Sequence, residues 1–127
     1  MKTKENTDFT NVKEGDTVIM VRSCYGEVDR FILTITRITK TRISVNYLFN
    51  KTPCTATFYK KDGYELGGTN RRIFIPTTEQ IEEVRQENKK KNLFNRIRDI
   101  ILAKKVELRE NLSIEDFENI YNIMTKQ

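Results

Sequence analysis

Basic side chains flank the turns in the first half of the chain, and two tyrosines stand beside them. Lysine and arginine neutralise phosphate groups and tyrosine rings stack on bases, so the combination is typical of nucleic-acid contacts. The alternative is that these are solvated cations at turns and that the tyrosines cover the edge of a sheet. The eight candidate binding residues are Lys40, Arg42, Tyr59, Lys60, Lys61, Tyr64, Arg71 and Arg72.

The residue types of the chain argue against most catalytic chemistry. The sequence contains no histidine, which excludes imidazole metal ligands and catalysis by Ser-His-Asp or Cys-His groups within this chain. Cys24 and Cys54 are too few to close a tetrahedral zinc site, and they are either two thiols or one disulfide. No phosphate-binding loop motif is present, and the acidic residues form no metal-binding pattern. We therefore expect no enzyme activity, no catalytic or metal-binding residues and no cofactor.

The net charge of +5 comes from 23 basic and 18 acidic side chains, and it is unevenly distributed. Residues 1–76 carry 13 basic and 8 acidic side chains, whereas residues 77–127 carry 10 of each. The excess of positive charge in the first half favours an acidic partner there. Two basic pairs, Lys60-Lys61 and Arg71-Arg72, flank one glycine-rich loop, so we expect their four cations to cluster on one rim. The sequence leaves open whether Lys40 and Arg42 join that cluster.

The first half has the pattern of a small antiparallel β structure. Apolar and polar residues alternate within short stretches, and turn residues such as Asp62-Gly63 separate these stretches. Arg37 interrupts the alternation before Ile38, which predicts a β-bulge. The expected strands are residues 17–21, 27–38, 43–49, 54–59 and 71–75. The expected core includes Val18, Leu33, Ile35, Val45, Tyr47 and Phe58.

The second half changes to helical spacing. Thr77 with Gln80 and Ser113 with Asp116 form two capping boxes, each of which predicts the start of a helix. Residues 85–92 contain no apolar side chain, so they are either a solvent-exposed helix or a linker. Two apolar stripes follow, and we expect them to pack on each other within one chain or between two chains of a homodimer. The first stripe is Leu93, Phe94, Ile97, Ile100 and Ile101, and the second is Ile114, Phe117, Ile120, Tyr121 and Met124.

Two parts of the chain resemble known families. The motifs Gly15-Asp16-x-Val18 and Gly26-x-Val28, then residues 36–41 and Ile43-x-Val45, have the order typical of KOW-type SH3-like barrels, so residues 12–76 resemble that class. Residues 58–68 (FYKKDGYELGG) resemble a segment of small uncharacterised bacteriophage proteins. The first resemblance implies binding to RNA or to ribosomal proteins. The second implies a phage or mobile-element origin.

The expected fold class is α+β: a small five-stranded antiparallel SH3-like barrel followed by a C-terminal helical region. The expected organisation is a flexible N-terminal arm at 1–11, the barrel at 12–76 and a helical extension at 77–127. No apolar run approaches the roughly 20 residues needed to span a bilayer, and no export signal is visible. We therefore expect no membrane association.

Three functions agree with these expectations. The first is that of a non-enzymatic, phage-type regulatory or anti-defence inhibitor that binds a host protein or ribonucleoprotein. The second is that of an RNA- or DNA-binding barrel that uses its basic rim. The third is sequestration of a small anionic nucleotide by basic side chains. The protein is expected to be a monomer, or a homodimer through its helices, in the cytoplasm of a bacterial host.

Overall fold

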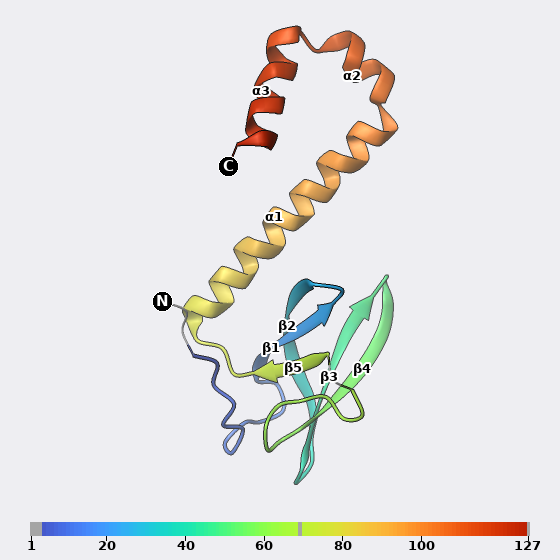
Figure 1. Cartoon of the computed structure of the whole chain (residues 1–127). Helices are drawn as coiled ribbons and strands as arrows, with labels where there is room; N and C mark the ends of the chain where they lie inside the picture. The colour runs from blue at the N-terminus through green and yellow to red at the C-terminus, as the bar shows by residue number, and fades with distance from the viewer. Residues whose placement is uncertain (1–3, 69, 127) are drawn as a thin grey trace. The chain divides into compact units, whose positions relative to one another are not determined.

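The computed structural model describes residues 4–68 and 70–126 and contains strands followed by helices (Figure 1). The α+β class expected from the sequence is confirmed. The strands are β1 (Thr17–Cys24), β2 (Glu27–Ile38), β3 (Arg42–Phe49), β4 (Thr52–Tyr59) and β5 (Arg71–Phe74). The helices are α1 (Thr78–Ala103), α2 (Lys105–Asn111) and α3 (Ile114–Thr125). The chain forms two compact units, a sheet unit that ends at Asn88 and a helical unit that begins at Lys89.

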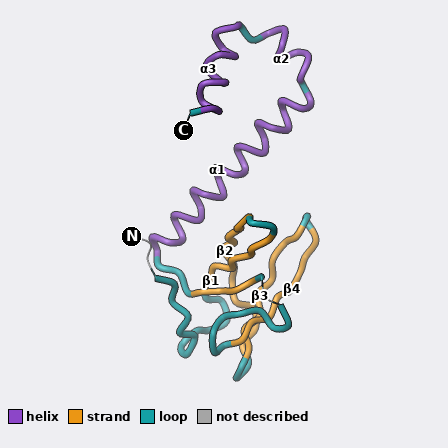
Figure 2. Tube along the Cα trace, viewed as in Figure 1, coloured by secondary structure: helices purple, strands orange, loops and turns teal. Residues whose placement is uncertain are grey.

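The five strands form one antiparallel sheet in the order β4-β3-β2-β1-β5, curled into a half-barrel (Figure 2). The register shifts between Ile35 and Arg37 where β2 pairs with β3, which confirms the bulge. Among the described residues no ladder joins β4 to β5. The loop between them forms one isolated bridge to each strand, Phe58 with Glu65 and Tyr64 with Arg72.

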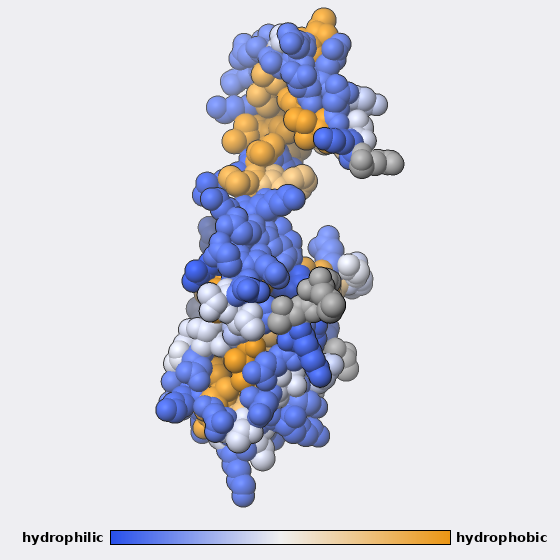
Figure 3. Space-filling model, turned by 90° about the vertical axis from the view of Figure 1, so that its left-hand side faces the viewer, coloured by the Kyte–Doolittle hydropathy of each residue, from blue (hydrophilic) through white to orange (hydrophobic). Residues whose placement is uncertain are grey.

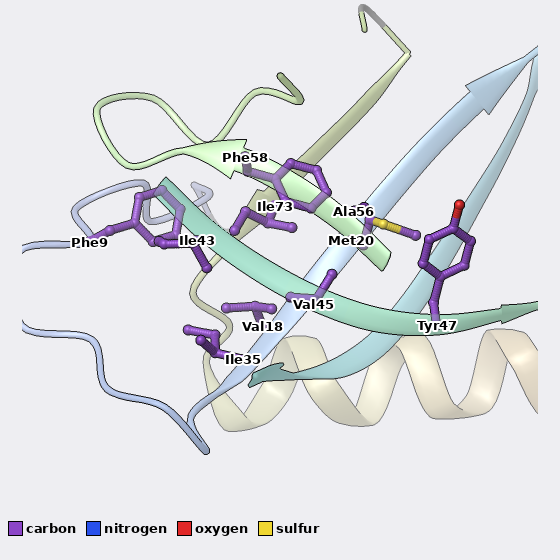
Figure 4. Close-up of a cluster of buried hydrophobic side chains, with 10 residues drawn as sticks. All are labelled: Phe9, Val18, Met20, Ile35, Ile43, Val45, Tyr47, Ala56, Phe58 and Ile73. Carbon is purple, nitrogen blue, oxygen red and sulfur yellow. The ribbon is translucent and has the colours of Figure 1, made fainter. Parts of the chain in front are cut away.

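The main core fills the concave side of the half-barrel (Figure 4). Five of the six core residues expected from the sequence are buried, and Leu33 is half-buried against the cluster. Phe49 continues the alternation of β3 but is 45% exposed, because it is the last residue before the turn to β4. The cluster consists of Phe9, Val18, Met20, Ile35, Ile43, Val45, Tyr47, Ala56, Phe58 and Ile73.

A second apolar cluster lies on the opposite face of β1 and includes the first turns of α1. Ile19 and Val21 of β1 pack there with Val84 of α1 and Phe74 of β5. Because both faces of β1 are covered, its apolar residues form a continuous run rather than an alternation. The sheet therefore needs the beginning of α1 to complete its packing.

Polar contacts extend this attachment along α1 as far as Asn88. The capping box at Thr77 is confirmed, with its backbone N–H donating to Gln80 Oε1 at 2.8 Å. Further along, Arg30 of β2 pairs with Glu87 at 3.2 Å, and Asn88 Nδ2 donates to the Arg30 carbonyl oxygen at 3.1 Å. Residues 85–92 are therefore helix and not linker. The sheet unit extends 12 residues past the boundary at 76 expected from the sequence, since its last residue is 88.

The segment before β1 packs on the sheet unit instead of forming a separate arm at 1–11. Phe9 is only 1% exposed and belongs to the main core. The backbone N–H of Ile75 donates to the Asn6 carbonyl oxygen at 2.8 Å. Residues 4–11 thus contribute to the fold because Phe9 supplies apolar surface that the short strands lack. The first three residues of the expected arm lie outside the described part of the chain.

The helical unit has a different character, because none of its described side chains is buried. The capping box at Ser113 is confirmed and begins α3, where Asp116 N–H donates to Ser113 Oγ at 3.1 Å. The expected packing of the two apolar stripes on each other within one chain is wrong, since all ten side chains are exposed. The sequence patterns did not indicate α2, which lengthens the connection beyond a tight hairpin turn. No helix in the described residues is both long enough and apolar enough to cross a membrane.

Candidate nucleic-acid interface

Five of the eight candidate binding residues line one open groove of about 790 Å³ at an end of the sheet unit. We call it the basic groove. Its walls come from the N-terminal segment, the β2–β3 turn and the end of β4. The lining residues are Thr7, Asp8, Phe9, Thr10, Lys40, Thr41, Arg42, Tyr59, Lys60 and Lys61.

Strand pairing brings the two basic segments of the groove together. Arg42 and Tyr59 are direct partners in the antiparallel β3–β4 ladder. Beyond that pair, the Lys60 backbone N–H donates to the Thr41 carbonyl oxygen at 2.8 Å. The β2–β3 turn is closed by Thr39, whose N–H donates to the Arg42 carbonyl at 2.9 Å. The cations at 40–42 and at 60–61 therefore lie on adjacent segments, although almost twenty residues separate them in sequence.

The four cations of the groove, Lys40, Arg42, Lys60 and Lys61, form no ion pair with any described carboxylate. Lys61 Nζ instead lies 5.2 Å from the ring centroid of Tyr59, within the range of a cation–π contact. Like charges held together without counter-charges cost free energy, and an anionic ligand would offset that cost. The groove thus combines cations that can neutralise phosphates with one aromatic ring.

Asp8 is the single acidic residue in the lining of the groove. Its Oδ1 accepts hydrogen bonds from the Thr10 hydroxyl at 2.6 Å and from the Thr10 backbone N–H at 3.1 Å. These two bonds, the hydroxyl first, lower the pKa of Asp8 from its ordinary value. Asp8 is therefore ionised at neutral pH and opposes part of the positive charge. The adjacent buried Phe9 anchors this segment to the core.

The remaining three candidates lie in a different hollow. Tyr64, Arg71 and Arg72 line a small pocket of about 100 Å³ together with residues of β1. Arg71 pairs with Glu65 at 3.0 Å, and Arg72 pairs with Glu5 at 3.0 Å. The expected cluster of residues 60–61 with 71–72 is therefore wrong. The physical reason is that the loop folds back on β5, where each arginine meets a glutamate.

Arg71 has a structural role in that second hollow. Its guanidinium lies 5.3 Å from the ring centroid of Tyr47, at the edge of the main core. Burial alone would lower the pKa of Arg71, but the hydrogen bond and the charge of Glu65 outweigh it, and the pKa lies above its ordinary value. Arg71 is thus already paired with a carboxylate, unlike the four cations of the basic groove.

The N-terminal wall of the groove is the part that the sequence patterns missed. Residues 7–10 were expected to belong to the arm, yet they complete the lining. The available signal was the single aromatic Phe9 in a polar stretch, followed by the Asp8-to-Thr10 hydrogen bonds of a tight turn. No group of three or more potential metal ligands comes together in residues 4–68 and 70–126. Cys24 and Cys54 are separate thiols, so the disulfide alternative is not realised.

The fold and the groove define a class of small α+β proteins with a half-barrel, an open basic groove and a helical unit. The model of one family, the phage ProQ C-terminal-like domain, matches residues 1–127, and the chain belongs to this family. The expected resemblance to small phage proteins is thereby confirmed. No curated protein and no solved structure matches the chain, so the KOW-type resemblance finds no named relative to support it.

Proposed function

We propose that the protein is a non-enzymatic binding protein that holds single-stranded nucleic acid, RNA in particular, in the basic groove. The observation that carries the proposal is the convergence of Lys40, Arg42, Lys60 and Lys61 on one groove, where none of them pairs with a carboxylate of residues 4–68 or 70–126. Membership in a ProQ-like phage family supports it, because ProQ-like domains are associated with binding of nucleic acid or RNA.

The chemistry of the groove favours a flexible strand over a rigid duplex. The cations neutralise successive phosphates, and Tyr59 offers a ring on which a base stacks when Lys61 moves to a phosphate. The groove is open, so it follows a backbone without reading the edges of bases. Binding of this kind tolerates many sequences and weakens steeply with salt, because each neutralised phosphate releases a counterion.

Fluorescence anisotropy with a labelled single-stranded RNA, measured over a range of salt concentrations, tests the proposal. Four phosphate contacts predict a slope of log K against log salt of about −3, and Lys60→Ala/Lys61→Ala should reduce its magnitude by about 1.4. The matched control is Lys89→Ala/Lys90→Ala, which removes the same charge from exposed positions of the helical unit. Equal losses in the two variants would show that net charge, and not the groove, attracts the RNA.

A small anionic nucleotide would use the same cations, and a competition experiment separates the two ligands. A mononucleotide contacts fewer cations than a strand, so it should displace labelled RNA only at a far higher concentration. If a mononucleotide binds the groove as tightly as the strand does, sequestration of a nucleotide replaces nucleic-acid binding as the function.

A second candidate function, regulation or anti-defence inhibition through a host protein, is favoured by the opposite end of the sheet unit. The turns β1–β2 and β3–β4 meet at that end, where the Arg22 guanidinium lies 5.3 Å from the Phe49 ring centroid. Tyr25 is fully exposed there and Leu48 is 66% exposed. Exposed apolar side chains grouped at one end suit a protein partner better than nucleic acid.

Affinity capture from a bacterial lysate tests this second candidate in the compartment proposed for it, the host cytoplasm. A host protein retained after nuclease treatment, and lost with Tyr25→Asp/Leu48→Asp but not with Lys60→Ala/Lys61→Ala, would support it. A host protein that disappears with nuclease would instead reach the chain through nucleic acid.

A further inference from the structure

The helical unit leaves an unusually large share of its apolar side chains in contact with solvent. Figure 3 shows apolar atoms gathered on its surface. The exposed fractions of the ten side chains in the two apolar stripes run from 41% to 79%. Most helix stability in proteins comes from burial of an apolar face, and a helix as short as α3, with 12 residues, is marginal alone. The two apolar stripes of the helical unit therefore require another surface that buries them.

Each stripe forms one face of its helix. On α3, Ile114, Phe117 and Ile120 recur at helical spacing, and Ile114, Phe117 and Tyr121 line a hollow of about 400 Å³. On α1, Leu93, Ile97 and Ile101 recur every four residues. Two such faces suit helix-on-helix packing, in which the side chains of one helix fill grooves of the other.

The charges beside the two stripes are opposite in sign. Within α3 the charged residues are Glu115, Asp116 and Glu118, and the helix contains no basic residue. In α1 from Lys89 onward, the sequence has five cations and one carboxylate, Asp99. The five cations are Lys89, Lys90, Lys91, Arg96 and Arg98. The acidic helix α3 and the basic part of α1 from Lys89 onward are thus complementary both in apolar surface and in charge.

We propose that two copies of the chain associate through their helical units, with α3 of one copy packed on residues 93–101 of α1 of the other. One chain carries both complementary faces but leaves both of them exposed. A two-fold arrangement satisfies both faces twice, since each copy supplies one acidic and one basic helix. A second copy is therefore the occupant that the surface fits, and this dimer does not depend on the ligand of the basic groove.

Light scattering on the full chain, with charge-reversed variants, tests the dimer. The wild-type chain should have twice its 15.0 kDa mass, falling toward one chain mass on dilution. Glu115→Lys/Glu118→Lys and Arg96→Glu/Arg98→Glu should each dissociate at concentrations where the wild type is dimeric. An equal mixture of the two variants should recover the dimer, because acidic α1 then meets basic α3 across the interface. The control Glu107→Lys/Glu110→Lys changes the same charge on α2 and should remain dimeric.

Two results would overturn the proposal. The first is a wild-type mass of one chain at every concentration. The second is that the mixture of the two variants stays monomeric, while a single chain with all four substitutions forms a compact monomer. That result would mean that α1 and α3 pack on each other within one chain. Ile97→Asp and Ile120→Asp should also give monomers that keep the melting temperature of the sheet unit, whereas Leu48→Asp in the sheet unit should leave the dimer intact.

Discussion

The backbone N–H of Lys60 donates a hydrogen bond to the carbonyl oxygen of Thr41 at 2.8 Å. This bond joins the β2–β3 turn to the end of β4 and sets Lys40 and Arg42 beside Lys60 and Lys61. The groove is therefore a consequence of strand register, and its geometry depends on the sheet being intact. Variants that weaken the sheet should lose binding through unfolding, and variants of the cations should lose binding with the fold unchanged.

The first prediction concerns the main core. Val45 is fully buried in β3, so Val45→Asp should lower the free energy of unfolding by about 3–5 kcal/mol, because it buries a charge without a partner. Urea denaturation followed by circular dichroism measures the loss. The control is Asn46→Asp on the exposed face, where the carboxylate can still accept the hydrogen bond from Thr55 Oγ1. A Val45→Asp midpoint equal to that of the control would contradict the burial of β3.

The second prediction concerns two glycines with positive φ. A methyl group at Gly63, at φ +80°, would lie 2.5 Å from the Ile73 carbonyl oxygen, while one at Gly67, at φ +74°, meets open space. Gly67→Ala should cost about 1–2 kcal/mol from the backbone conformation alone. Gly63→Ala should cost clearly more, because it also displaces β5 or Phe9. Thermal unfolding measures the loss of stability in both variants. Equal losses would show that β5 moves to accommodate the methyl group without a further cost in free energy.

The third prediction concerns Asp8. Asp8→Asn removes the carboxylate that lines the groove among the described residues and should strengthen RNA binding several-fold at low salt, an effect that fades as salt screens the charges. Glu27→Gln at the other end of the sheet unit makes the same charge change and should alter affinity much less. Anisotropy at two salt concentrations measures both, and equal gains would place the RNA outside the groove.

The direction of the Asp8 pKa also sets a pH dependence. Because the folded-state pKa lies below the ordinary value of 3.8, the stabilisation from Thr10 is fully present above that value and is lost as pH falls through the lowered pKa. Protonation of Asp8 should therefore contribute nothing to RNA affinity between pH 5 and 8, and Asp8→Asn should keep its advantage throughout. An advantage that vanished near pH 5 would show that Asp8 titrates close to that pH.

The fourth prediction separates the two hollows. Arg71→Gln leaves Glu65 without its partner in a site that is mostly shielded from water, so it should lower the free energy of unfolding by roughly 1–3 kcal/mol. It should change RNA affinity less than two-fold at a temperature where the variant is folded. Lys60→Ala/Lys61→Ala should leave the free energy of unfolding nearly unchanged and should lower RNA affinity. If RNA affinity falls equally in both variants, the basic groove and the pocket at Arg71 form one RNA-binding surface, which contradicts the prediction.

Local sequence signals determined much of the fold. The strand patterns, the bulge near Arg37 and the capping boxes at Thr77 and Ser113 were predictable, because each depends on residues within a few positions of one another. The core residues of β3 and β4 were predictable for the same reason, since alternation in one strand identifies its buried face. These features need no knowledge of which strands are neighbours.

The members of the basic groove, in contrast, were decided by tertiary structure. Sequence proximity to one loop suggested that Arg71 and Arg72 join Lys60 and Lys61, but Glu65 and Glu5 pair with those arginines across the fold. Residues 40–42, instead of Arg71 and Arg72, lie beside Lys60 and Lys61 because of the β3–β4 register. That register follows from a two-residue turn at Asn50 and Lys51, both with positive φ, which makes Arg42 oppose Tyr59, whereas the strand limits expected from the sequence left four residues for this turn.

The sequence by itself thus determined the five strands, the starts of α1 and α3, the faces of these elements and a phage-type basic protein with helices at its end. Only the tertiary structure decided which cations are neutralised, that Phe9 belongs to the core, and that α1 begins in the sheet unit. It also showed that the two apolar stripes do not cover each other within one chain. The physical reason is that hydrophobic period and capping are local properties of a chain, whereas ion pairing and burial depend on which distant segments meet.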